Sequence, residues 1–245
     1  MSHPVLTVAQ MREVDRLMVE EYGISLEQMM EQAGRNLSDL AVQWLQSQTD
    51  RQPPYDLVVV CGTGNNGGGG MTAARYLSNR GHAVTVVLAG ETGRLKPVPK
   101  IRWQTLQHCP VDKIVGWKPS RKAIFANADL IIDALLGYGL TGAPRGIAAQ
   151  YIEDIIQAGN RRLLALDVPS GLDLDSGKPY DLCLPAAATM TLALPKVGLT
   201  KATAKPYVGQ LYLADIGVPP QLYRHLGLPE QILFQNQALR LITED

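Results

Sequence analysis

The sequence lacks any long apolar run, any excess of charge of one sign and any dense set of cysteines. Its apolar runs are short, such as those at residues 57–61 and 163–166, whereas a membrane-spanning helix needs about 20 apolar residues. We therefore expect no association with a membrane. The first residues, Met-Ser-His-Pro, do not form a basic stretch followed by an apolar one, so no signal peptide is predicted.

The charge balance and the cysteines limit the protein class further. The 23 basic and 23 acidic residues sum to a net charge of zero, without the basic patch or stripe of a nucleic-acid-binding domain. No nucleic-acid partner is therefore expected. Cys61, Cys109 and Cys183 are too few, and odd in number, for a disulfide framework, and they favour a reducing compartment. The sequence predicts a cytoplasmic protein whose cysteines are small core residues.

Residues 1–50 are predicted to form a helical segment. Thr7 with Gln10, and Ser25 with Gln28, have the spacing of capping boxes, in which two residues cap the start of a helix reciprocally. Apolar residues recur at helical spacing after each box. Because these apolar stripes need cover, we expect the segment to pack on the rest of the protein.

After residue 55, short apolar runs alternate with longer amphipathic stretches. Strands are predicted over residues 57–61, 83–88, 114–117, 128–136, 162–168, 188–194 and 210–216. Helices are predicted over about residues 71–79, 97–108 and 147–157. This alternation indicates an α/β protein with a parallel sheet covered on both faces. Because no repeat and no domain boundary is evident, residues 1–245 are predicted to form a single domain.

Ligands of open parallel sheets bind beyond the carboxyl ends of the strands, so residues at these ends are the first candidates for a site. The glycine-rich run 62–70 follows the first predicted strand and contains the spacing Gly-x-Gly-x-x-Gly. Glycines permit a close approach of the backbone to a ligand, and the start of the next helix attracts phosphate. Asn65 and Asn66 add amides that suit a ribose, an amide or an ion. A tight turn without a ligand is the alternative.

Two other predicted strands deliver an aspartate to the same edge. Asp133 precedes a second glycine-containing loop, and Asp167 precedes Pro169 and Ser170. Each aspartate is also compatible with a capping role or a local turn. The oxygen donors of Asn66, Asp133 and Ser170 are of the kind that holds an alkali or alkaline-earth ion. Their spacing does not tell which ion.

Missing motifs exclude other site classes. The sequence has no Gly-x-x-x-x-Gly-Lys-Ser/Thr run, so it does not contain a P-loop. Its four histidines are scattered and do not have the spacing of zinc ligands.

These motifs together resemble the YjeF N-terminal domain family, the NAD(P)H-hydrate epimerases. The resemblance covers nearly the full length of the chain. It rests on residues 11–15, 30–34, 62–70, 133–139, 167–171 and 193–199.

The resemblance implies a Rossmann-like three-layer α/β/α fold and a cofactor-repair activity. The implied reaction interconverts the R and S forms of NADHX and NADPHX, which are NADH and NADPH hydrated at the nicotinamide ring. An S-specific dehydratase, fused to this domain in many bacteria, is the implied functional partner, and a homodimer is the implied assembly. One potassium ion per subunit is implied, with Asn66, Asp133 and Ser170 as ligands. The implied substrate-binding residues are Asn65, Asn66, Gly67, Gly68, Gly69, Gly137, Tyr138, Gly139, Leu140, Thr141, Gly142, Ala143 and Asp167.

One position departs from the family pattern. The family loop reads Asn-Asn-Gly-Gly-Asp-Gly, and this sequence has Gly69 at the acidic position. The missing carboxylate either relaxes repulsion of an anionic substrate or removes a substrate or catalytic contact.

Epimerisation at a carbon that bears a hydroxyl and a ring nitrogen requires proton transfer. Asp167 is the predicted general acid and base, because Asp133 would hold the ion. Two alternatives stay open. In an NAD-dependent oxidoreductase, Glu91 would bind the ribose after the second strand. A non-catalytic nucleotide-binding or scaffold module of the same fold is the other alternative, and Gly69 is compatible with it.

Overall fold

The computed structural model describes residues 4–242, so the first and last three residues of the predicted domain lie outside the described residues. An eight-stranded sheet forms its centre, in the order β3-β2-β1-β4-β5-β6-β7-β8. Neighbouring strands are parallel except for β7 and β8. The strands are β1 (Asp56–Cys61), β2 (Ala83–Leu88), β3 (Asp112–Val115), β4 (Leu130–Ala134), β5 (Leu163–Leu166), β6 (Ala188–Leu192), β7 (Gln210–Ala214) and β8 (Leu239–Leu241).

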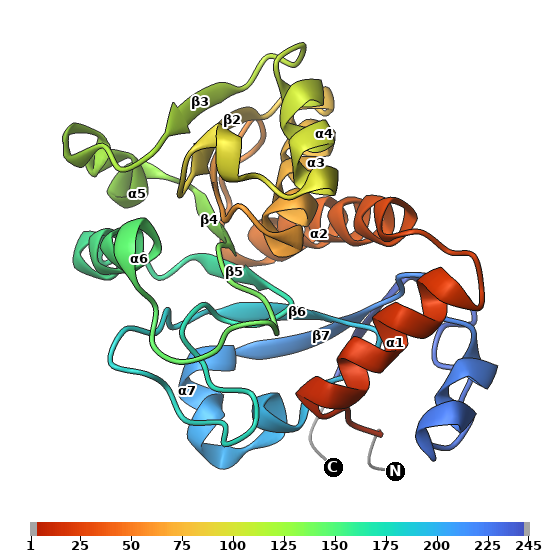
Figure 1. Ribbon diagram of the computed structural model, residues 1–245. Helices are drawn as coiled ribbons and strands as arrows, with labels where there is room; N and C mark the ends of the chain where they lie inside the picture. The colour runs from red at the N-terminus through yellow and green to blue at the C-terminus, as the bar shows by residue number, and fades with distance from the viewer. Residues whose placement is uncertain (1–3, 243–245) are drawn as a thin grey trace.

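Helices cover both faces of this sheet, which confirms the predicted three-layer α/β/α fold (Figure 1). The layer with α2, α3 and α4 packs on one face, and α5 and α6 pack on the other. The α-helices are α1 (Val8–Glu20), α2 (Leu26–Gln48), α3 (Asn65–Asn79), α4 (Pro97–Leu106), α5 (Ala123–Asn127), α6 (Gly146–Ala158) and α7 (Lys205–Val208). None of the helices within residues 4–242 has both the length and the apolar content that crossing a membrane requires.

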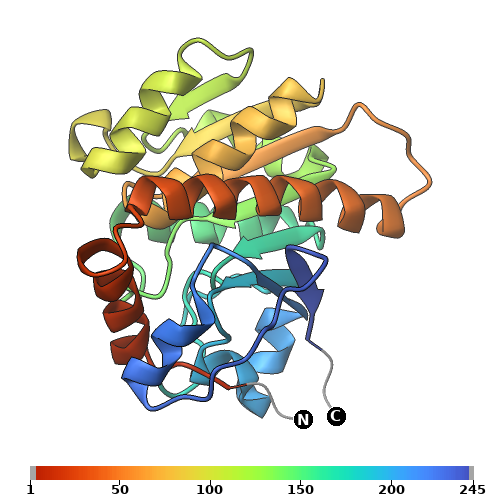
Figure 2. The same ribbon diagram turned by 90° about the vertical axis from the view of Figure 1, so that its right-hand side faces the viewer.

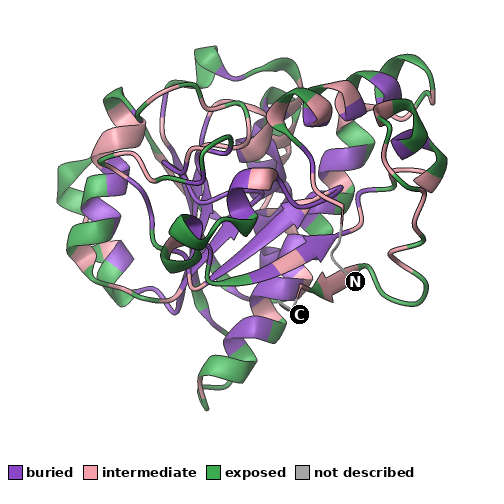
Figure 3. Cartoon of the chain, turned by 90° about the horizontal axis from the view of Figure 1, so that it is seen from below, coloured by how far each residue is buried: buried purple, intermediate pink, exposed green. Residues whose placement is uncertain are grey.

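Strand β1 shows why the sheet needs two helical layers. Leu57 and Val59 belong to the core beneath α2 and α3, whereas Val58 and Val60 belong to the core beneath α5 and α6. Successive side chains of a strand point to opposite faces, so an unbroken apolar run predicts burial on both. In Figure 3 the central strands are mostly buried, and the exposed residues lie on the outer sides of the helices and in the loops.

The two N-terminal helices begin where the capping boxes predict. The Thr7 amide donates to Gln10 Oε1 at 2.9 Å and the Gln10 amide donates to Thr7 Oγ1 at 3.1 Å. Ser25 and Gln28 exchange the same pair of bonds at the start of α2. Helix α2 crosses the sheet beside α3, and α1 lies beside the C-terminal 3₁₀ helix η5 (Pro220–Leu226) (Figure 2). In the structure these two helices pack on the rest of the protein, α2 against α3 and α1 against η5.

The C-terminal strand β8 was not predicted from the sequence. It has only three residues, in which Arg240 pairs with Leu213 of β7 in antiparallel register. Three residues are too few to show a period, and this strand forms because the edge of β7 offers unpaired backbone groups.

The sequence predicted that helix α3 starts at about residue 71, and this start was wrong, because α3 begins at Asn65. None of the glycines at 67–70 has a positive φ, so their conformational freedom is not used. What matters is the missing side chain. A Cβ on Gly67 would lie 1.9 Å from the carbonyl oxygen of Gly62, and one on Gly70 would lie 2.5 Å from Ala134 Cβ. The glycines therefore allow α3 to lie directly against the loop after β1 and against β4.

We expect two alanine substitutions in this helix to differ sharply. Gly67→Ala forces Cβ into backbone atoms and should lower the free energy of unfolding by about 2–3 kcal/mol or more. Gly69→Ala meets only Leu166 Cδ2, at 2.9 Å, and the end of a side chain can move. The gain in helix propensity, about 1 kcal/mol, should bring this variant close to the wild type. Urea unfolding followed by circular dichroism measures both, and equal losses would contradict the packing role of Gly67.

Candidate functional site

A cavity of about 790 Å³ lies at the carboxyl ends of β1, β4 and β5. The strand order changes direction between β1 and β4, since β2 and β3 lie on one side and β5 to β8 on the other. Ligands of open α/β sheets bind at such a switch point, because the loops after the two strands leave in opposite directions. Helices α1 and α2 contribute Met11, Asp15 and Met30 to the lining. The cavity therefore has the position that the strand pattern predicted.

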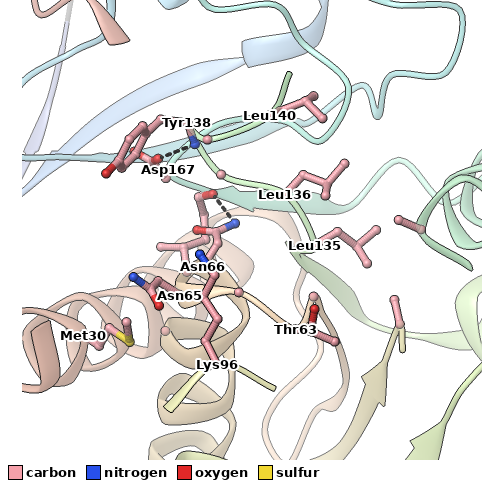
Figure 4. A pocket seen from close by; sticks show the side chains of 18 of the residues that line it. Met30, Thr63, Asn65, Asn66, Lys96, Leu135, Leu136, Tyr138, Leu140 and Asp167 are labelled. Atoms are coloured by element: carbon pink, nitrogen blue, oxygen red, sulfur yellow. Dashed lines mark hydrogen bonds between the residues drawn. The ribbon is translucent and has the colours of Figure 1, made fainter. Parts of the chain in front are cut away.

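Most of the predicted substrate-binding residues line this cavity (Figure 4). These are Asn65, Asn66, Gly69, Gly137, Tyr138, Gly139, Leu140, Thr141 and Asp167. Gly67 and Gly68 are buried within α3, and Gly142 and Ala143 are not among the lining residues. Asp133 and Ser170 are fully buried, next to the lining residues Leu135 and Leu136.

Asp133 and Ser170 tie the end of β4 to the turn after β5. The Ser170 hydroxyl donates to Asp133 Oδ1 at 2.6 Å, and the Ser170 amide donates to Oδ2 at 2.7 Å. The amide of Leu135 also donates to Oδ1, at 3.1 Å. Burial nevertheless raises the pKa of Asp133 to about 6, against the effect of these three bonds. No Lys or Arg within residues 4–242 pairs with this carboxylate, so its charge is left uncompensated.

Asn66 reaches the same region from the first turn of α3. Its side-chain amide donates to the carbonyl oxygen of Leu166 at 3.2 Å, one residue before Asp167 (Figure 4). This bond turns the amide nitrogen toward β5 and leaves Oδ1 without a hydrogen bond from any described residue. The Asn66 side chain also lies against Gly137, where a Cβ would be 3.2 Å from it. Asn66 thus contacts the end of β5 and the loop that follows β4.

Asp167 accepts a hydrogen bond at each of its two carboxylate oxygens. It is buried and has a φ of +67°, a backbone conformation that is uncommon for residues other than glycine. The ammonium of Lys196 donates to Oδ1 at 2.5 Å, and the amide of Tyr138 donates to Oδ2 at 3.2 Å. Lys196 is itself fully buried and donates two further hydrogen bonds, to Thr191 Oγ1 and to the carbonyl oxygen of Leu192. Both oxygens of the carboxylate are therefore fixed in place.

A second carboxylate comes from the N-terminal helix. The Tyr138 hydroxyl donates to the carboxylate of Asp15, and both residues line the cavity. Burial raises the pKa of Asp15, although the bond from Tyr138 opposes this. Burial and the neighbouring Asp15 also raise the pKa of the Tyr138 hydroxyl.

Sequence reasoning missed Asp15 and Lys196 as site residues. Asp15 interrupts the apolar face of α1 at helical spacing between Met11 and Met18, and such an interruption is a detectable signal. Lys196 follows the apolar run 193–195 directly, and a lysine next to an apolar run indicates a buried partner. Neither signal identifies that partner, because the carboxylate lies 29 positions away for Lys196 and the hydroxyl 123 positions away for Asp15.

The cavity carries an excess of free positive charge. Four cationic residues line it, and none of them has an ion pair or side-chain hydrogen bond within residues 4–242; these are Arg12, Arg94, Lys96 and Arg145. The two carboxylates of the lining, Asp15 and Asp167, are both already engaged. The cavity therefore suits a ligand with several negative charges, such as a dinucleotide diphosphate.

The end of β2 lacks the carboxylate of an NAD-dependent oxidoreductase. Ala89 and Gly90 line the cavity there, whereas Glu91 is exposed and is not among the lining residues. In such enzymes an acidic residue at this strand end binds the ribose hydroxyls. Arg94 follows instead and lines the cavity, which disfavours the oxidoreductase alternative.

The family described as YjeF-related protein N-terminus matches residues 26–198. The chain belongs to this family. It is 41% identical to the NAD(P)H-hydrate epimerase of Dehalogenimonas lykanthroporepellens, over 91% of this chain and 86% of that protein. It is 35% identical to the NAD(P)H-hydrate epimerase of Pirellula staleyi, over 88% of this chain and 93% of that protein.

Longer relatives and a solved structure extend the comparison. The bifunctional NAD(P)H-hydrate repair enzyme Nnr of Moorella thermoacetica is 34% identical over 89% of this chain, which spans 41% of that protein. The crystal structure of the yeast protein ynu0 superposes with a TM-score of 0.83, at 21% identity, over 98% of this chain and all of that one. At this identity the superposition shows a shared fold.

The buried ion pair predicts a clear pattern of stabilities. Lys196→Met leaves the carboxylate of Asp167 buried without its cation, and we expect the free energy of unfolding to fall by about 3–5 kcal/mol. The double variant Asp167→Asn with Lys196→Met removes both charges and should be more stable than Lys196→Met alone. Denaturant unfolding of Lys196→Met, Asp167→Asn and the double variant gives the coupling between the two positions, and additive losses would contradict the pair.

Proposed function

We propose that this chain is an NAD(P)H-hydrate epimerase, which interconverts the R and S forms of hydrated NADH and NADPH. The name of the relatives that match nearly its whole length supports this activity. The single structural observation that carries the proposal is the cavity, which is lined by four free cations and by Asp167 hydrogen-bonded to Lys196. A substrate with a diphosphate supplies the complementary negative charge, and an isomerisation needs no redox group.

Asp167 is the general acid and base of this proposal. Proton transfer by a positioned carboxylate contributes typically about 10²–10⁴-fold to a rate. Lys196 and the Tyr138 amide fix its orientation toward the cavity from two sides. Asn65, Asn66, Gly69 and the loop 137–141 then bind the substrate around it.

The residues Asn66, Asp133 and Ser170 fit a monovalent cation. Asp133 supplies a buried carboxylate without a cationic partner, and Asn66 Oδ1 supplies a free carbonyl oxygen. Hard cations take oxygen ligands of this kind, and carbonyl oxygens can complete the shell. Among the residues that the structure describes, no group of three His, Cys, Asp or Glu residues has the arrangement of a metal cluster, which a potassium site does not require. When bound, potassium supplies a fixed positive charge that orients the substrate and offsets its phosphates.

The relatives that carry the name bifunctional repair enzyme support a functional partner, the S-specific dehydratase expected from the resemblance. We also propose a cytoplasmic homodimer. Sedimentation velocity measures the assembly directly.

The test of the activity is a coupled assay. A mixture of R and S NADHX is incubated with an S-specific dehydratase in potassium buffer, and the R fraction is followed with and without this protein. We expect R to disappear faster with the protein present, because the dehydratase removes only S. Unchanged R with retained binding of NADHX would favour the non-catalytic module, with Gly69 as the reason.

Asp167→Asn serves as the matched variant in the same assay. It keeps the size of the side chain and one accepting oxygen but cannot exchange a proton. Turnover should fall by about 10² or more. Wild-type turnover in this variant would exclude Asp167 from the proton transfer.

Potassium should stabilise the protein more at high pH than at low pH. The raised pKa of Asp133 means that its contribution to stability is fully present below pH 3.8 and is lost as the pH rises through about 6, where the buried group ionises. A bound cation compensates that charge, so the rise in Tm between sodium and potassium buffers should be larger at pH 8 than at pH 5. Thermal unfolding at matched ionic strength measures this difference in Tm. If Asp133→Asn shows the same pH-dependent rise in Tm as the wild type, the assignment of Asp133 as a potassium ligand is contradicted.

A further inference from the structure

Tyr138 lies between two carboxylates of the cavity. Its hydroxyl donates to Asp15 on α1. Its backbone amide donates to Asp167 after β5 (Figure 4). Residues of four segments therefore form one hydrogen-bonded network, from Asp15 through Tyr138 and Asp167 to Lys196.

The proposed reaction needs proton transfer on two faces of one carbon. First the C–O bond breaks while the lone pair of the ring nitrogen forms a C=N double bond, and the oxygen leaves as water after accepting one proton. A water then adds to the opposite face, the nitrogen regains its lone pair, and this water loses one proton. No electrons are gained or lost, and the proton donated balances the proton removed. Asp167 is fixed at both carboxylate oxygens, so it serves only one face of this carbon.

Few groups of the lining can serve the other face. A guanidinium group only donates hydrogen bonds and has no accepting atom, so we do not assign the proton transfer to Arg12, Arg94 or Arg145 of the lining. Lys96 is one of the four cations of the lining that suit the negative charges of the ligand, and the asparagines carry no titratable group. Apart from Asp167, only Asp15 and Tyr138 of the described lining residues remain.

We propose that Tyr138 and Asp15 form the second proton-transfer pair of the active site, with the Tyr138 hydroxyl facing the substrate and Asp15 exchanging the proton behind it. This inference rests on the proposed epimerase activity. Helix α1, which carries Asp15, is held against Leu194, Ile216 and Leu222 in its own apolar cluster. The N-terminal helix thereby becomes part of the catalytic apparatus.

The charged neighbours of the pair agree with this role. Asp15 faces Tyr138, Asp167 and Lys196, and Tyr138 also faces Arg12. Burial raises the pKa values of both members of the pair, so each keeps its proton to a higher pH than in water. A proton held in this way can be donated to a leaving hydroxyl and recovered from the next water.

The test uses Tyr138→Phe, Asp15→Asn and the double variant in the coupled assay with NADHX. We expect each single variant to lower kcat by about 10² while KM stays within about twofold of the wild type, because the chemistry is lost and the binding is kept. The double variant should be no slower than the slower single variant, since the two residues act as one unit. Tyr151→Phe is the matched control, because its hydroxyl also makes one bond, to Gly116 O at 2.6 Å, away from the cavity. It should keep the wild-type kcat.

Three outcomes would overturn the inference. Wild-type kcat in Tyr138→Phe would remove the hydroxyl from the reaction, and multiplying losses in the double variant would show that the residues act independently. If Tyr138→Phe does not fold, an unchanged kcat in folded Asp15→Asn has the same consequence. Failure of the proposed function is distinguishable, because the wild type itself would then not accelerate the loss of R.

Discussion

The ion pair between Lys196 and Asp167 is the interaction on which the geometry of the site depends. A fully buried ammonium is tolerated only when its protons are all used, and Lys196 uses them on Asp167, Thr191 and Leu192. The pair joins the end of β5 to the turn after β6. Through the amide of Tyr138 it also fixes the loop after β4, so three strand ends take their positions from one buried charge.

The glycine-rich start of α3 is the second constraint on the site. It depends on the missing side chains of the glycines, which let the helix approach its neighbours closely. Helical glycines cost about 1 kcal/mol each relative to alanine, and α3 has four of them in its first turns. The cost is accepted because Gly67 and Gly70 let the helix touch the backbone of Gly62 and the side chain of Ala134. This contact brings Asn66 within hydrogen-bonding distance of β5. The low helix propensity of the glycines thus lowers stability, but it allows the polar side chain of Asn66 to lie at the switch point of the sheet.

The features that the sequence predicts well are those set by local chemistry. Thr7 and Ser25 mark helix starts because a cap needs only a partner three residues on, and the strand over 57–61 is visible as an apolar run. The start of α3 was misplaced because helix propensity opposes it, and only a tertiary contact decides it. Strand β8 is too short to show a pattern and depends on the edge of β7.

The residues of the candidate site also fall into those that local sequence patterns predict and those that they do not. Asn66, Asp133, Asp167 and Ser170 lie at or just beyond the carboxyl ends of apolar strands, so their shared edge was predictable from the order of elements. Asp15 and Lys196 reach the site through contacts between distant segments, which no local pattern encodes. The four free cations of the cavity are likewise dispersed over α1, the segment after β2 and the loop before α6.

The most direct test of the central claim needs no second enzyme. In an equilibrated mixture of R and S NADHX, exchange between the two forms can be followed by NMR while this protein is added. The account predicts an exchange rate that grows in proportion to the protein concentration, with an unchanged ratio of R to S. An exchange rate that stays at the uncatalysed value, in potassium buffer and with NADHX bound, would contradict it.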